Sequence, residues 1–228
     1  MPIRPNALLT GVALERSRQR VEKTAPPVAE GRTPEVVLVR ADRRLMDAAV
    51  AGDDALARAL GHAVTPGWAP SRRALRSTRD ALLDTGEAPV WGARLFVYGA
   101  PPALVGWGGF KGAPADGTVE IGYEIAGSLR GRGLATAAAR AMLAEALADA
   151  RVTRVIAHTL AGLNASNHIL ESLGFALDEA VEQDGHAVWR YALETPRWRL
   201  RQAALSRPAH ISGSATGTAV GPGFRRRR

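Results

Sequence analysis

A glycine-rich turn between a strand and a helix carries the clearest chemistry in this chain. Residues 119–125 alternate apolar and polar side chains, which predicts a half-buried strand. After a short loop, residues 130–135 (Arg-Gly-Arg-Gly-Leu-Ala) open an alanine-rich helix that we expect to run to about residue 150. The first amides of a helix lack intrahelical partners and lie at the positive end of its dipole, and glycines let an anion approach the backbone. The turn therefore predicts binding of a phosphate-bearing ligand.

The spacing around this turn excludes two common phosphate-binding motifs. A P-loop requires a lysine after its second glycine, and the sequence has no lysine beyond Lys111. A dinucleotide fingerprint requires a third glycine where Thr136 stands. The preceding strand also carries Glu120 and Glu124, whereas a central parallel strand is usually apolar throughout. A different phosphate-bearing ligand is therefore expected.

Two motifs in a fixed order carry a family resemblance. Residues 130–135 fit the pattern [Arg/Gln]-x-x-Gly-x-[Gly/Ala], and residues 164–175 read Asn-Ala-Ser-Asn-His-Ile-Leu-Glu-Ser-Leu-Gly-Phe. Together they resemble the GNAT superfamily of acetyl-CoA-dependent N-acetyltransferases, over roughly residues 35–193. The nearest branch is that of the ribosomal-protein alanine N-acetyltransferases. The resemblance implies acetyl-CoA as cosubstrate and an α/β fold with a GNAT-type mixed, mostly antiparallel sheet flanked by helices.

The pattern of hydrophobic residues and turn formers along the chain agrees with that fold class. Meander strands followed by a β-α-β-α-β order predict an α/β sandwich with a mixed sheet. The expected elements are a strand at 35–40, helices at 41–64 (with a break near 51) and 71–83, strands at 93–98, 104–111 and 118–126, a helix at 133–150, a strand at 153–159, a helix at 165–173, and strands at 175–182 and 186–193.

The resemblance also implies which residues contact the cosubstrate. Pyrophosphate contacts fall on Arg130, Gly131, Arg132, Gly133, Leu134 and Ala135, and contacts to the cofactor arm on Asn164, Ser166 and Asn167. The alternative role for the last three is capping of the helix that they begin. In the family a backbone amide polarises the thioester carbonyl at a bulge where the central strand parts from its neighbour, and here this amide belongs to Ile125 or Ala126.

Two carboxylates are the candidate general bases. Alternation places Glu120 and Glu124 on one strand face. In the family this strand borders the acceptor amine, so either carboxylate is expected to take its proton; the alternative is a solvated strand face. Glu124 is preferred because it lies nearer the expected bulge. The tyrosine that many family members use as general acid is replaced by Leu170. This leaves Ser166 or a water as the proton donor, or no donor at all, because a thiol of pKa about 8.5 is a good leaving group.

Aromatic and histidine residues give weaker expectations. Trp68 lies in a proline-flanked loop that walls the acceptor pocket in this family, so substrate contact is expected there. The other tryptophans considered are expected in the core: Trp91, Trp107 and Trp189. His158 and His168 lack a second ligand pattern, and the sequence has no cysteine, so no metal site is expected.

Charge and composition divide the chain into three parts. The 228 residues carry a net charge of +8, with 46% hydrophobic residues and no cysteine. Residues 196–228 hold eight arginines and no acidic residue, and residues 1–34 also carry a positive excess. We expect a flexible or partly helical extension over 1–34, an acetyltransferase domain over 35–195, and a disordered basic tail over 196–228. The tail offers contact with nucleic acid, which we do not favour over a solubilising role.

These observations together predict an enzyme. The expected reaction is direct transfer of an acetyl group from acetyl-CoA to a primary amine, because no cysteine is present to carry an acetyl intermediate. The acceptor is a protein N-terminus or a small-molecule amine. The alternative is a non-catalytic CoA-binding or nucleic-acid-associated module on the same fold. The absence of cysteine and of a long apolar run favours a cytoplasmic location without membrane contact, and oligomeric state is not predicted.

Overall fold

The computed structural model describes residues 34–82, 89–162, 164–183 and 185–195. In chain order its elements are β1 (Val37–Arg40), α2 (Arg43–Ala51), α3 (Asp53–Leu60), β2 (Ala63–Val64), α4 (Arg72–Ala81), β3 (Ala93–Tyr98), β4 (Ala103–Phe110), β5 (Thr118–Ile125), the 3₁₀ turn η1 (Gly127–Leu129), α5 (Leu134–Leu147), β6 (Arg154–Leu160), α6 (Ala165–Leu173), β7 (Ala176–Gln183) and β8 (His186–Glu194). The predicted order of elements is confirmed except at β2, which was expected to be helical.

One mixed sheet organises these elements. Its strands lie in the order β1-β3-β4-β5-β6-β8-β7, and β2 pairs with β4 beside this path. Pairing is antiparallel except between β2 and β4 and between β5 and β6. The predicted mixed, mostly antiparallel sheet is therefore confirmed, with β5 and β6 as the parallel pair at its centre.

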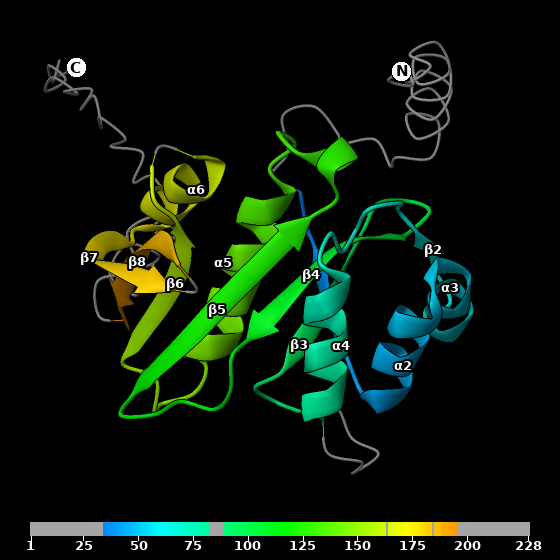
Figure 1. Cartoon of the computed structure of the whole chain (residues 1–228), viewed down its shortest axis with the longest axis horizontal. Helices are drawn as coiled ribbons and strands as arrows, with labels where there is room; N and C mark the ends of the chain where they lie inside the picture. The colour runs from blue at the N-terminus through cyan, green and yellow to red at the C-terminus, as the bar shows by residue number, and fades with distance from the viewer. Residues whose placement is uncertain (1–33, 83–88, 163, 184, 196–228) are drawn as a thin grey trace, which may run out of the picture.

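Helices cover both faces of the sheet (Figure 1). On one side α2, α3 and α4 pack on β3 and β4 through a buried cluster that includes Leu95, Leu104 and Trp107. On the other side α5 and α6 pack on a larger cluster that includes Ile121 and Ile125. We call these sides the α4 face and the α5 face. Because strand side chains alternate between faces, each position of β5 is assigned to one of them.

Helix ends follow from local sequence. Asp42 and Ser71 accept hydrogen bonds from the amides of Leu45 and Ala74, which caps α2 and α4. The predicted helix over 41–64 does break near residue 51, but it ends earlier than expected. Gly61 adopts a left-handed φ of 75° that stops α3. Ala63–Val64 then pairs with β4 instead of continuing the helix.

A buried arginine ties β3 to α5. The Arg94 side chain is 1% exposed and donates to Oε2 of Glu145 at 3.0 and 2.9 Å. It also donates to the backbone carbonyls of Val90, Gly92 and Ala93, and its guanidinium lies 5.1 Å from the centre of the Phe110 ring. A buried charge with this many partners holds the sheet and helix in one arrangement, because losing its counter-ion leaves it uncompensated.

The expected extensions over 1–34 and 196–228 lie almost wholly outside the described residues. Within the described part of the chain, no helix combines the length and apolarity needed to cross a bilayer.

Candidate active site

The parallel strands β5 and β6 are paired only along the first part of β5 and then separate. Their pairing covers only Thr118–Glu120 against Arg154–Ile156. Beyond this point β5 pairs with β4 and β6 pairs with β8, and the two strands diverge (Figure 1). We call the last paired position, Glu120 opposite Ile156, the fork. Past the fork, the backbone N–H and C=O groups of β5 and β6 face each other across a gap and form no ladder of hydrogen bonds between the two strands.

The register of β5 shows which amides face this gap. Lys111 N donates to Glu120 O at 3.0 Å, and Ala126 N donates to Val105 O at 2.9 Å. In an antiparallel pair alternate residues bond to the partner strand, so the N–H groups of Tyr123 and Ile125 point the other way, into the gap. The Ala126 amide is already engaged, which leaves Ile125 as the better of the two predicted polarising amides.

The expected bulge in β5 is absent, and this is a correction. The pairing with β4 runs without a register shift from Ile121 to Ile125. The irregularity lies one strand away, between β3 and β4, at Phe96–Val97. The divergence of β5 from β6 therefore comes from loss of pairing, and the reason for preferring Glu124 as the base is removed.

An open helix N-terminus lies beyond the end of β5. Gly131 and Gly133 have φ values of 76° and 73°, a conformation that side-chain-bearing residues rarely adopt. Gly133 is the N-cap of α5 and supplies no side-chain cap, so no side chain of the cap residue satisfies the first amides of a helix of 14 residues. Arg130 and Arg132 form no ion pair with any described residue. The geometry fits a pyrophosphate.

The start of α6 is built differently. Asn164 caps it by accepting from the amides of Ser166 and Asn167 at 2.9 and 3.1 Å, so the capping role is present. The Asn167 side chain is 2% exposed and donates to Gly162 O at 2.6 Å, while its Oδ1 is buried with no partner in the described structure. A buried amide oxygen without a donor suits a ligand that brings one. Leu170 is a core residue.

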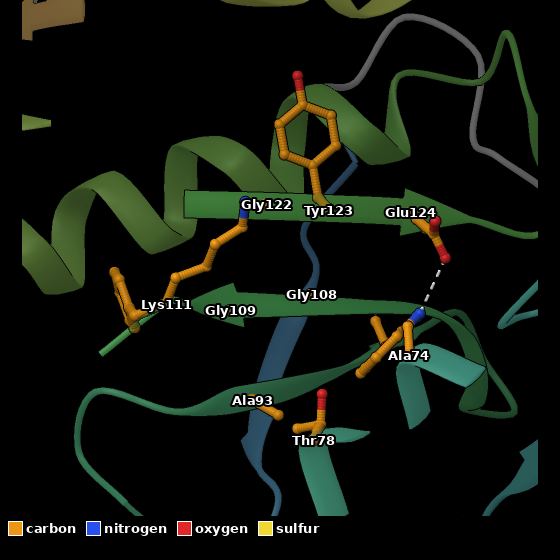
Figure 2. A pocket seen from close by; sticks show the side chains of 11 residues that line it. Ala74, Thr78, Ala93, Gly108, Gly109, Lys111, Gly122, Tyr123 and Glu124 are labelled. Atoms are coloured by element: carbon orange, nitrogen blue, oxygen red, sulfur yellow. Dashed lines mark hydrogen bonds between the residues drawn. The ribbon is translucent and has the colours of Figure 1, made fainter. Parts of the chain in front are cut away.

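A pocket of about 320 Å³ opens on the α4 face beside the gap. It lies among α4, β3, β4 and β5 (Figure 2). Its lining residues are mostly small: Ala74, Thr78, Ala93, Trp107, Gly108, Gly109, Phe110, Lys111, Gly122, Tyr123 and Glu124. A Cβ built on Gly122 would meet nothing closer than the Lys111 side chain at 4.0 Å, so the space above this glycine is open.

Glu124 supplies a carboxylate to the pocket wall. Its Oε2 accepts from Trp107 Nε1 at 3.0 Å, the bond drawn in Figure 2. Its Oε1 has no hydrogen-bond partner among the described residues, so one oxygen remains for a ligand. Tyr123 points to the other side, away from Ala74 and Thr78 (Figure 2). Burial raises the pKa of the Tyr123 hydroxyl far above its ordinary value, so this group stays neutral.

Glu120 lies at the fork and binds two donors. Lys111 Nζ and His158 Nδ1 both approach its Oε1, the histidine at 2.9 Å. Glu120 and His158 side chains are each 19% exposed. The fork therefore holds a connected carboxylate, imidazole and ammonium on the same face as the pocket.

A family model for the GNAT acetyltransferase domain matches residues 37–176, more than half of the chain. The chain belongs to the GNAT family of acetyltransferases. No curated protein matches it significantly in sequence.

Solved GNAT structures share the fold at low sequence identity. A putative GNAT-family acetyltransferase from Bordetella pertussis is 22% identical, with a TM-score of 0.52, covering 71% of this chain and 96% of that one. Mutant forms of the spermidine/spermine N-acetyltransferase SpeG from Vibrio cholerae are 15% identical, with a TM-score of 0.51, covering 74% and 98%. RimL, a ribosomal L7/L12 alpha-N-protein acetyltransferase, overlaps at 18% identity and a TM-score of 0.48, covering 74% and 92%. The first two likenesses show the fold.

The structure assembles most residues predicted for the GNAT site around one gap and its adjoining pocket. The turn at 130–135 and the amide of Ile125 lie beyond or along the open part of β5, and Glu120 and Glu124 share the α4 face. Trp68 was expected to contact the substrate, but it is 2% exposed and does not line the pocket. It packs edge-on against Trp107, with 6.4 Å between the ring centroids. The loop brings Trp68 inward, and Asp53 accepts its indole N–H.

Four side chains of the pocket and the fork were not predicted as site residues from the sequence. Trp107 was expected in the core, and it is 93% buried, yet it also lines the pocket and holds Glu124. Thr78 and Lys111 carried no signal of their own. His158 was considered only as a metal ligand. Its position two residues past the fork, on the polar face of an alternating strand, was the available signal.

Proposed function

We propose that this GNAT protein transfers an acetyl group from acetyl-CoA directly to a primary amine, either a protein N-terminus or a small molecule. The observation that carries the proposal is the gap between β5 and β6. It has a phosphate-fitting helix N-terminus at its open end and a carboxylate-bearing pocket on one side. An extended thioester bound at one end of such a gap presents its acyl group to an acceptor in the pocket.

The cosubstrate side is built from backbone. Amides at the start of α5 hold the pyrophosphate, and Arg130 and Arg132 add positive potential. Asn164, Ser166 and Asn167 border the cofactor arm, with the unpartnered Oδ1 of Asn167 available to a donor on it. The Ile125 amide faces the gap and polarises the thioester carbonyl as charge develops on its oxygen.

The acceptor side is built from side chains. The open space above Gly122 lies between two carboxylates that are about 13 Å apart along the strand, from four residues at about 3.3 Å each. An amine placed there lies between the two carboxylates. Glu124 receives the ammonium form through its free oxygen, and the proton leaves toward the fork. Deprotonating an α-amino group of pKa about 7.7–8.0 costs less than deprotonating a lysine, which favours an α-amine.

Release of free thiol from acetyl-CoA, measured against a panel of primary amines, tests this proposal. The panel contains peptides with free N-termini, the same peptides with blocked N-termini, and diamines. We expect thiol release with at least one unblocked amine, matched by an equal amount of acetylated amine in mass spectrometry. Binding of acetyl-CoA without turnover on any amine would support the non-catalytic alternative.

A further inference from the structure

The pair formed by His158 and Glu120 sits where the proposed reaction needs a proton acceptor. His158 lies two residues past the fork on β6, and Gly122 lies two residues past it on β5. Val155 and Ala157 of β6 belong to the core on the α5 face. Alternation therefore places His158 on the α4 face, with Glu120, Gly122 and the pocket.

The contacts of Glu120 suit a residue that orients His158 better than one that takes a proton from the amine itself. Both donors approach the same oxygen, Oε1, one from Lys111 and one from His158. A carboxylate accepts, so His158 Nδ1 carries the hydrogen of that bond, and in the neutral imidazole Nε2 is then the nitrogen without a hydrogen. Nε2 has no hydrogen-bond partner within the described residues. An imidazole fixed by a carboxylate through one nitrogen presents the other as a base.

We propose that His158 is the general base of the acetyl transfer, directly or through one water, and that Glu120 is its positioning residue. This inference rests on the proposed function. The amine nitrogen forms a bond to the thioester carbonyl carbon, and the carbon–sulfur bond breaks, with its electron pair leaving on the CoA thiolate. The proton of the attacking amine passes to His158 Nε2. His158 then carries the positive charge beside Glu120, and its proton passes through solvent to the thiolate, which restores the imidazole and gives the free thiol.

Charged side chains lie on the same face as the imidazole. Glu120 contacts it with a negative charge, while Lys111 on β4 brings a positive charge to the same carboxylate oxygen. Arg190 of β8 lies directly opposite His158 in the register, but it is paired with Asp178 and Glu179. Glu124 lies further along β5 on the same face. These neighbours carry charges of both signs, so a pH profile would combine the titration of several groups. Rescue of a His158 variant by free imidazole reports on the imidazole alone.

Replacing His158 with alanine tests the proposal. We expect kcat to fall by roughly 10²–10⁴-fold, as for loss of a general base, with the dissociation constant for acetyl-CoA unchanged in calorimetry. Free imidazole added to the assay is expected to restore part of the H158A rate. His158→Asn provides a second variant, because it keeps a donor toward Glu120 and lacks the base. His186→Ala is the matched control, since His186 is exposed at the start of β8.

Coupling between the two residues separates a dyad from two independent groups. Glu120→Gln is expected to lower kcat by about tenfold and to slow H158A no further, because residues acting as one unit are not additive. Wild-type kcat in H158A and H158N, rates that imidazole does not restore, or additive effects in the double variant would each overturn the proposal. If the wild-type protein acetylates no amine, the proposed function is wrong, and the assignment of His158 as its general base falls with it. If the wild-type protein is active, the variants test His158 alone.

Discussion

The two halves of the proposed site are built on different principles. On the cosubstrate side the pyrophosphate cradle is one continuous segment, residues 130–135, which presents backbone amides through glycines at positive φ and a helix N-terminus. The acceptor half is assembled from side chains on α4, β3, β4 and β5, brought together only by the sheet. Recognition by backbone amides requires particular residues, such as glycines, at fixed positions, while a pocket wall requires only side chains of suitable size and charge. The same fold can therefore keep its cosubstrate and change its acceptor.

Removing Arg94 should damage both halves, and it is the largest effect that we expect. Arg94 joins β3, which borders the pocket, to α5, whose N-terminus forms the cradle. Arg94→Ala empties a buried site and removes the donor to three backbone carbonyls and to the partly exposed Glu145, so the free energy of unfolding should fall by about 3–5 kcal/mol. Chemical denaturation measures it. Arg79→Ala, at a partly exposed pair with Asp47, should cost no more than about 1 kcal/mol; equal losses would show that Arg94 is not an anchor.

Neutralising Glu124 should affect the acceptor half alone. Glu124→Gln keeps the size of the side chain and loses the charge that receives an ammonium group. The loss of a charged hydrogen bond, about 1.5–3 kcal/mol, predicts a fall in kcat/KM for the amine of roughly 10–150-fold, mainly through KM. Steady-state kinetics at saturating acetyl-CoA measure it, with Glu182→Gln on the exposed face of β7 as control. A change confined to kcat would instead identify Glu124 as a base.

Filling the floor of the pocket should have a smaller, graded effect. Gly122→Val points a side chain into the open space on the α4 face, and valine is favoured in strands. We expect the KM for the amine to rise by about tenfold, near 1.4 kcal/mol, with folding stability kept. Gly122→Ala should lie between this variant and the wild type. Unchanged amine kinetics in both would mean that the acceptor does not occupy the space above Gly122.

The sequence predicted the fold, and it singled out the segment proposed for the cosubstrate, because both depend on local pattern. Alternation, capping residues and glycine spacing gave the order of elements, including helix 165–173 and strand 93–98 at their observed bounds. Helix ends near β2 were missed because a two-residue strand leaves no periodic signal. The expected bulge near Ile125 was carried over from the family, and the divergence arises instead where pairing with β6 stops.

Apart from Glu120 and Glu124, the proposed acceptor half was not predicted, because its contacts join residues far apart in the chain. Glu120 meets Lys111 and His158 only once β4, β5 and β6 are aligned, and their types alone do not reveal that register. Trp68 and Trp107 illustrate the same limit. Both have the composition of core or pocket residues, and only the packing shows that Trp107 lines the pocket while Trp68 supports it from behind.

Calorimetric titration of acetyl-CoA into Gly133→Glu and Glu124→Gln, beside the wild-type protein, tests the separation of the two halves most directly. Gly133→Glu places a side chain and a negative charge at a position of φ 73° where the pyrophosphate approaches the backbone. We predict at least tenfold weaker binding for this variant, about 1.4 kcal/mol, and wild-type affinity for Glu124→Gln. Wild-type affinity in a folded Gly133→Glu variant, or weakened binding in Glu124→Gln, would contradict the assignment of the cradle to the cosubstrate and of the pocket to the amine.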